Sequence, residues 1–198
     1  MDKFAILIPI HNEEKRIVAF NKQLQVLEIP YFFVDDGSTD DTIYRIYENH
    51  IPCVSYFPQQ GKGFAIKIGA HSLIKLNFDW ILTMDMEGFY DVANTVEKLD
   101  ALLLFHEHET DIFIGNRLWN KYSMNWLDYY RNKIISWWIS RKAGMNFADV
   151  KCGVRLLNKK VFDLNCTNNK NKYESDVLIH ASKLNWRIME VPIDFIGK

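Results

Sequence analysis

The sequence predicts a single α/β domain with a central, mostly parallel sheet flanked by helices. Short apolar runs such as residues 4–10 alternate with amphipathic stretches, and polar or turn-forming residues follow each run. A continuous apolar run is typical of a strand that is buried on both faces of a parallel sheet. The repeated order of strand, turn and helix indicates an α/β sheet, and a length of 198 residues favours one domain over two.

The first strand is expected at residues 4–10. Asn12 is then expected to cap a helix that runs to about Leu27, with Glu13 and Glu14 in its first turn, where the helix dipole favours negative charge. The remaining apolar and turn patterns predict strands at 31–35, 53–57, 80–84 and 111–115, helices at 42–48 and from Gly63 to Leu76, and an alternating tail at 187–193.

Composition excludes several classes of protein. The formal net charge of −1 gives no overall field that would attract a polyanion, so nucleic acid is not an expected partner. The three cysteines are widely spaced and form no zinc-binding pattern. Free thiols suit the reducing cytoplasm, which is where the sequence places this protein.

Polar side chains follow the predicted strands at the sheet edge where open α/β sheets bind ligands. They are His11, Asn12 and Glu13, then Asp35 and Asp36, then Asp85 and Glu87, then Asn116 and Arg117. Carboxylates that converge repel one another, and a divalent cation relieves that repulsion. Asp85 and Glu87 are therefore candidate ligands of Mg²⁺ or Mn²⁺, and the simpler alternative is a pair of exposed loop acids. For Asp35 and Asp36 the simpler alternative is a turn and cap before the next helix.

The Gly61-Lys62-Gly63 segment predicts a flexible loop that packs closely on a helix. It lacks the GxxxxGK[ST] spacing of a phosphate-binding loop, and no GxGxxG follows the first strand. Lys62 can still reach a phosphate group.

A basic and aromatic segment lies in the second half of the chain. Residues 117–142 carry a net charge of +5 against −6 for the remainder, and they contain four of the six tryptophans. Tryptophan and tyrosine beside lysine and arginine indicate an amphipathic helix at a lipid headgroup interface. The alternative is an aromatic helix packed into the core with a solvated basic face.

Eight segments carry a resemblance to a known family. They are residues 8–14, 34–40, 61–63, 83–87, 115–117, 149–155, 173–176 and 190–193. Their order and content resemble the family 2 glycosyltransferases of GT-A fold, which is a Rossmann-like α/β fold. The later segments look like the branch of dolichyl-phosphate mannose synthase-like, or polyprenyl-phosphate, glycosyltransferases.

The resemblance implies an inverting hexosyltransferase that uses a UDP-sugar or GDP-sugar donor and a divalent metal. Residues 1–117 would form the nucleotide-sugar half and 118–198 the acceptor half. By similarity, Asp36 would accept from a base N–H, and Asp85 and Glu87 would stand at the metal-binding DxD motif. The donor-binding set that this implies is Pro9, His11, Glu13, Asp36, Lys62, Asp85 and Arg117, and the catalytic set is Asp85, Asp149, Arg117 and Arg131.

The chain departs from the family pattern next to this motif. Glu87 replaces the usual second aspartate, and Phe89 and Tyr90 stand where glutamine and histidine are usual. These departures leave open a catalytically inert module that only binds nucleotide-sugars.

The acceptor decides which proton chemistry is needed. A polyprenyl phosphate is largely ionised near neutral pH, so its oxygen needs no strong base to attack the anomeric carbon. A saccharide or protein hydroxyl would need a carboxylate base, for which Asp149, Glu174 and Asp176 are the candidates. Asp149 with Arg155 resembles the acceptor block of the family, and the alternative is a structural ion pair. A lipid acceptor would place the protein at the cytoplasmic face of a membrane.

Overall fold

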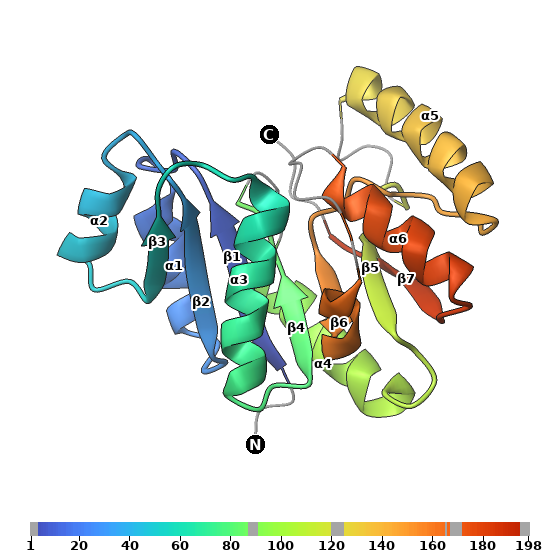
Figure 1. Cartoon of the computed structure of the whole chain (residues 1–198), viewed down its shortest axis with the longest axis horizontal. Coiled ribbons are helices and arrows are strands. Elements are labelled where there is room, and N and C mark those ends of the chain that lie inside the picture. The colour runs from blue at the N-terminus through green and yellow to red at the C-terminus, as the bar shows by residue number, and fades with distance from the viewer. Residues whose placement is uncertain (1–3, 87–90, 120–124, 165, 167–171, 195–198) are drawn as a thin grey trace.

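The computed structural model describes residues 4–86, 91–119, 125–164, 166 and 172–194. One seven-stranded sheet runs through the molecule in the order β3-β2-β1-β4-β6-β5-β7 (Figure 1). The strands are β1 (Phe4–Ile10), β2 (Tyr31–Asp36), β3 (Cys53–Tyr56), β4 (Trp80–Thr83), β5 (Ile112–Asn116), β6 (Arg155–Asn158) and β7 (Ile188–Pro192). Strands from both halves of the sequence join this sheet, which confirms the single α/β domain.

Helices cover both faces of the sheet and enclose two apolar cores. The helices are α1 (Ile17–Gln25), α2 (Thr42–Glu48), α3 (Lys62–Lys75), α4 (Val92–His106), α5 (Trp126–Ala143) and α6 (Tyr173–Lys183), with a short 3₁₀ helix at Lys159–Asp163. Side chains of α1, α2 and α4 build one core, and those of α3, α5 and α6 build the other. Strand β1 is buried along its whole length and supplies alternate residues to each core, as its apolar run predicts.

One strand runs against the others. β1, β2, β3 and β4 pair in parallel, as do β5 and β7, whereas β6 is antiparallel to both β4 and β5. The expected mostly parallel sheet is confirmed. Strand β6 and helices α4 and α6 were not among the predicted elements. β6 begins at Arg155, directly after Gly153 and Val154, and its four residues are too few to show the alternation of apolar and polar residues that indicates a strand.

The expected helix start at Asn12 is wrong, because α1 begins at Ile17. Asn12 has a left-handed backbone with φ of 57°, and its side-chain oxygen accepts from the Thr39 backbone N–H at 2.8 Å. Its own N–H donates to Ser38 Oγ at 2.8 Å. The residues after β1 therefore hold the loop after β2 in place instead of starting a helix.

Asp35 forms a turn and does not cap α2. Its carboxylate accepts from the backbone N–H and hydroxyl of Ser38 and from Ser55 Oγ at 2.8 Å. The residue at the cap position of α2 is Asp41, whose side chain makes no capping hydrogen bond. Asp35 thus fixes the loop that directly follows Asp36, the last residue of β2.

Candidate active site

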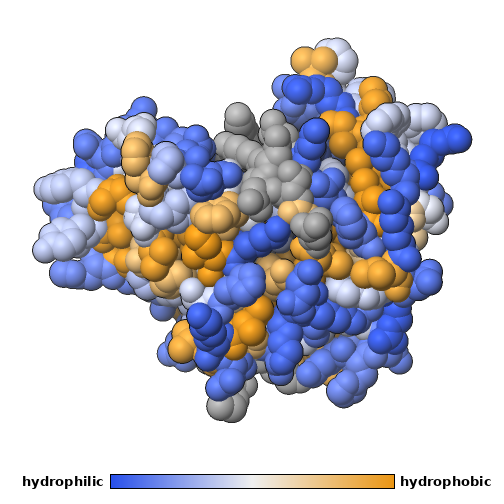
Figure 2. Space-filling view, viewed as in Figure 1, coloured by the Kyte–Doolittle hydropathy of each residue, from blue (hydrophilic) through white to orange (hydrophobic). Residues whose placement is uncertain are grey.

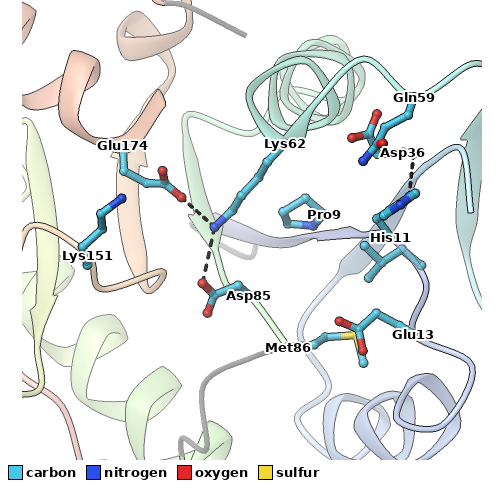
Figure 3. Close-up of a pocket in the computed structure, with 11 residues that line it drawn as sticks. Pro9, His11, Glu13, Asp36, Gln59, Lys62, Asp85, Met86, Lys151 and Glu174 are labelled. Carbon is cyan, nitrogen blue, oxygen red and sulfur yellow. Dashed lines mark hydrogen bonds and ion pairs between the residues drawn. The ribbon is translucent and has the colours of Figure 1, made fainter. Parts of the chain in front are cut away.

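A cleft opens at the carboxyl ends of β1, β2 and β4, where the sequence placed the ligand site (Figure 3). Side chains from both halves of the chain line it. They are Pro9, Ile10, His11, Glu13, Asp36, Gln59, Lys62, Asp85, Met86, Lys151 and Glu174. The cleft therefore brings together six of the seven residues of the expected donor-binding set.

Asp36 lies at one end of the cleft and is almost fully buried. Its Oδ1 accepts from the Tyr56 hydroxyl and the Gln60 backbone N–H, each at 2.7 Å. Its Oδ2 accepts from the Gly61 N–H at 2.9 Å. Burial, and then the neighbouring carboxylate of Asp36, raise the pKa of Tyr56. Asp36 thus fastens the loop before α3, and a carboxylate oxygen such as Oδ2 can accept a second hydrogen bond.

The same end of the cleft is shaped by His11 and Glu13. His11 Nδ1 lies 3.0 Å from the Asp36 carbonyl oxygen. The Glu13 carboxylate is buried and accepts two hydrogen bonds from Arg16, at 2.7 and 2.8 Å. Both side chains are therefore fixed before any ligand binds.

The centre of the cleft is an ion-pair bridge. The ammonium of Lys62, at the first residue of α3, lies 3.3 Å from Asp85 Oδ2 and 2.6 Å from Glu174 Oε1. Figure 3 shows Lys62 reaching across to Asp85 after β4 and to Glu174 in the first turn of α6. One cation thus joins two carboxylates that come from different elements, the loop after β4 and the start of α6.

The charges of this bridge set the ionisation of its members. Burial raises the pKa of Glu174, but Lys62 and Arg155 outweigh it and lower that pKa to about 2. Burial lowers the pKa of Lys62, and Asp85 and Glu174 outweigh that effect and raise it. Lys62 and Glu174 are therefore both charged at neutral pH.

Two neighbours confine the bridge. A Cβ atom on Gly153 would lie 2.0 to 2.3 Å from the carboxylate atoms of Asp85, so only glycine leaves room for that carboxylate here. Arg155 is buried and donates to the carbonyl oxygens of Val150 and Glu174, each at 2.7 Å. The loop before β6 and the start of α6 are thereby tied to each other beside the cleft.

Asp149 and Arg117 form a second ion pair, which does not line the cleft. Arg117 Nε and Nη2 donate to the two oxygens of Asp149, each at 2.8 Å, and the Arg117 backbone N–H donates at 2.9 Å. Asn132 of α5 donates to the same carboxylate at 2.6 Å. The partner of Asp149 is thus Arg117, whereas the sequence had coupled Asp149 with Arg155.

The structure does not bring the remaining predicted residues into the cleft. Arg131 is exposed on α5 and lies 3.9 Å from Asp128 in the same helix. Glu87, Phe89 and Tyr90 lie outside the described residues. Across the residues that the structure describes, no group of three or more histidine, cysteine, aspartate or glutamate side chains could hold a metal ion.

Helix α5 exposes its tryptophans, whereas Ile139 and Ala143 are buried in the core. The side chains that it buries include Asn132 and Ser136, whereas Trp137 and Trp138 are 59% and 54% exposed. Lys142 lies 3.8 Å from the centre of the Trp138 ring, and Arg141 lies 5.4 Å from that of Trp137. Figure 2 shows hydrophobic and hydrophilic side chains next to each other on the surface in the region of α5. The alternative of an aromatic helix packed into the core is therefore wrong.

The sequence model of the family described as "Glycosyl transferase family 2" matches residues 5–162. This chain belongs to that family. The match extends from the first strand through the cleft-lining residues of α3 and β4 to the loop that carries Lys151.

Two relatives have names that describe lipid-linked sugar transfer. An undecaprenyl-phosphate 4-deoxy-4-formamido-L-arabinose transferase of Proteus mirabilis is 26% identical over 176 residues, which is 82% of this chain and 51% of the relative. An undecaprenyl-phosphate mannosyltransferase of Micrococcus luteus is 25% identical over 208 residues, covering 97% of this chain and 83% of that protein. The chain thus spans about half the length of the Proteus relative.

Solved structures show the same GT-A fold. Glucosyl-3-phosphoglycerate synthase of Mycobacterium tuberculosis, in complex with Mn²⁺, UDP and glucosyl-3-phosphoglycerate, superposes with a TM-score of 0.74 at 17% identity. The superposition covers 97% of this chain and 70% of that one. A complex of the same synthase with Mg²⁺ and UDP gives a TM-score of 0.72 at 17% identity, with 97% of this chain and 69% of that one covered.

Sequence reasoning missed several residues of the cleft. Gln59 lies in none of the motif segments, and nothing in the sequence pointed to it as a cleft residue. Lys151 and Glu174 lie inside the motif segments at 149–155 and 173–176. Their membership of these segments is the sequence signal that could have identified them as cleft residues. Glu174 was considered only as a base, whereas the structure gives it the role of an ion-pair partner.

Replacing Asp149 with asparagine should lower the free energy of unfolding by about 3 kcal/mol at pH 7, because it breaks a buried ion pair. Burial raises the pKa of Asp149, and Arg117 and Asn132 outweigh it, so the folded-state pKa lies below the ordinary value of 3.8. A lowered pKa adds stability above that value, and the addition is lost as the pH falls through the folded-state pKa.

Urea unfolding of the parent and Asp149→Asn should therefore show the full difference from pH 5 to 7. The difference should shrink below about pH 4. A gap that stayed constant from pH 7 to pH 3 would contradict this account of Asp149.

Proposed function

We propose that this chain transfers a sugar from a nucleotide-sugar donor to a polyprenyl phosphate, with inversion at the anomeric carbon. The observation that carries the proposal is the ion-pair bridge of Lys62, Asp85 and Glu174 in a cleft at the carboxyl ends of the strands. The names of the Proteus and Micrococcus relatives support the lipid phosphate as acceptor.

The nucleotide would lie at the Asp36 end of the cleft. Asp36 Oδ2 can accept a hydrogen bond from a ring N–H, a group that both uracil and guanine carry, so the donor is a UDP-sugar or a GDP-sugar. Pro9, His11 and Glu13 form the adjoining wall. The diphosphate would then extend toward Lys62, whose ammonium can bind its oxygens.

Asp85 would hold the Mg²⁺ or Mn²⁺ ion, together with Glu87. The residues present fit such an ion, because Asp85 offers a hard oxygen donor in the cleft at the carboxyl end of β4. The metal complexes of the mycobacterial synthase support this assignment. When bound, the ion would supply positive charge against the leaving nucleoside diphosphate.

The pKa, ion pairing and position of the candidate carboxylates favour a phosphate acceptor over a hydroxyl acceptor. A hydroxyl needs a general base whose pKa lies near the working pH. Glu174 has a pKa of about 2 and is paired with Lys62, and Asp149 is buried against Arg117. Asp176 is not among the residues that line the cleft. An ionised phosphate oxygen needs no such base.

Residues 118–198 would form the acceptor half, and residues 1–117 the donor half. Lys151 lines the cleft beside Glu174 and is the cation closest in the sequence to Asp149. The pair of Asp149 and Arg117 would position this loop for the acceptor phosphate, and Arg131 would meet lipid phosphate from the exposed face of α5.

We further propose that α5 lies on the cytoplasmic face of a membrane that contains the lipid acceptor. Its exposed tryptophans stack with basic side chains, an arrangement suited to anionic headgroups. None of the helices that the structure describes is long and apolar enough to span a bilayer. Helix α5 would lie parallel to the membrane plane.

The first test is incorporation of labelled sugar from UDP- and GDP-sugars into organic-extractable undecaprenyl phosphate with Mn²⁺. Asp85→Asn should lower kcat/KM at least about 100-fold, because it removes charge that holds the diphosphate-binding cation. Asp79→Asn is the matched control, since Asp79 pairs with Lys159 on the surface before β4.

Transfer to soluble glycan without lipid labelling would favour a hydroxyl acceptor. Nucleotide binding with neither transfer nor donor hydrolysis would favour the inert binding module. Equal activity of the parent and Asp85→Asn would refute the role of Asp85.

Gly153→Ala tests the position of the Asp85 carboxylate while keeping its charge. The new methyl group would meet that carboxylate at about 2 Å, so the flexible side chain must turn away. We expect a decrease in kcat/KM of at least about 10-fold, with the thermal midpoint within about 4 °C of the parent. Parent-like activity in a folded Gly153→Ala variant would count against the assignment.

The membrane contact predicts that Arg141→Gln with Lys142→Gln weakens binding to anionic vesicles. Each basic side chain near an anionic surface contributes about 1 kcal/mol, so the pair should lower the partition coefficient about tenfold or more at low salt. Sedimentation with phosphatidylglycerol vesicles measures this, and Lys15→Gln with Lys22→Gln on exposed positions at α1 is the control. Equal losses in both double variants would argue against α5 as the contact.

A further inference from the structure

We infer that Lys62, through its ion pair with Asp85, is a built-in counter-cation that makes divalent metal binding depend on the nucleotide diphosphate. This inference rests on the metal and nucleotide site proposed above. It concerns how the binding of the metal ion and that of the nucleotide affect each other, which the proposed reaction does not specify.

The contacts make Lys62 a competitor for the metal. Its ammonium lies 3.3 Å from Asp85 Oδ2, and the side chains of Lys62 and Asp85 are only 17% and 20% exposed. Solvent screens such a pair less than it screens a surface pair. A divalent ion that approached Asp85 alone would meet the ammonium at close range, and repulsion would weaken its binding.

Glu174 gives Lys62 a second anchor. The shorter contact of the bridge, 2.6 Å, is to Glu174, which is itself tied to buried Arg155 through its carbonyl oxygen. Lys62 can therefore release Asp85 and still keep one carboxylate partner. Gly153 lies close against the Asp85 carboxylate, whereas Lys62 has a long side chain that can change partner.

A nucleoside diphosphate changes the balance of charge. Its oxygens give Lys62 a new anionic partner, and the ammonium then no longer competes with the metal ion for Asp85. Metal and nucleotide should accordingly strengthen each other's binding, and thermodynamic linkage requires the two effects to be equal. Lys62 thus weakens the binding of the metal ion alone and stabilises the complex in which metal and nucleotide are both bound.

The test measures Mn²⁺ binding by electron paramagnetic resonance, with and without UDP or GDP, and nucleotide binding by calorimetry. In the parent, the better nucleotide should tighten Mn²⁺ binding about tenfold or more. Lys62→Met should tighten the binding of Mn²⁺ alone severalfold, weaken that of the nucleotide, and remove most of the coupling. Lys75→Met is the control, because it makes the same change at an exposed position in the last turn of α3.

Glu174→Gln provides an independent variant that should act in the opposite direction. Without Glu174, Asp85 is the carboxylate left to Lys62 in the bridge, so Mn²⁺ alone should bind more weakly than in the parent. Circular dichroism and thermal midpoints establish that each variant is folded. If Lys62→Met did not fold, the opposite shift in Glu174→Gln would still decide the question.

The outcomes separate this inference from the proposed function. A parent that binds no Mn²⁺ with either nucleotide would overturn the proposed metal site and the inference together. Metal-nucleotide coupling in the parent that persists in Lys62→Met would overturn only the inference. Tighter binding of Mn²⁺ alone together with weaker binding of the nucleotide in Lys62→Met would establish it.

Discussion

The ammonium of Lys62 is the group on which the cleft depends. It lies between Asp85, which follows β4, and Glu174, which begins α6, and without it two carboxylates would face each other in a partly buried space. Like charges at such distances repel and raise each other's pKa, so this geometry requires a cation. Arg155 adds a second positive charge behind Glu174, and the pKa of Glu174 falls to about 2 as a result. The cleft is thus built for a positive charge before any ligand enters.

A second buried charge sets the orientation of α5. Asp149 is fully buried and accepts from Arg117 at the end of β5 and from Asn132 on α5. A buried carboxylate needs such donors, so the face of α5 that carries Asn132, Ser136, Ile139 and Ala143 packs against the protein. Its tryptophans are left on the outer face beside Arg141 and Lys142. The surface proposed to meet lipid is therefore a consequence of how one aspartate is paired.

These two clusters explain why carboxylates that look alike in the sequence differ in chemistry. Asp85 lines the cleft, Asp149 is enclosed by its partners, and Glu174 is held by Lys62. Each was a candidate for direct contact with substrate on residue type alone. Burial and pairing decide which one can meet a ligand, and neither can be read from the spacing of residues.

The sequence by itself determined the α/β class, the strands β1 to β5 and the edge of the sheet at which polar residues gather. These follow from local patterns, since an apolar run and the turn that follows it report burial of neighbouring residues. The tertiary structure decided the rest. It placed β6 antiparallel between β4 and β5, moved the start of α1 to Ile17, and paired Lys62 with Glu174 across 112 positions of the chain. Such contacts depend on long-range packing and charge, and no local pattern encodes which distant partner a side chain will meet.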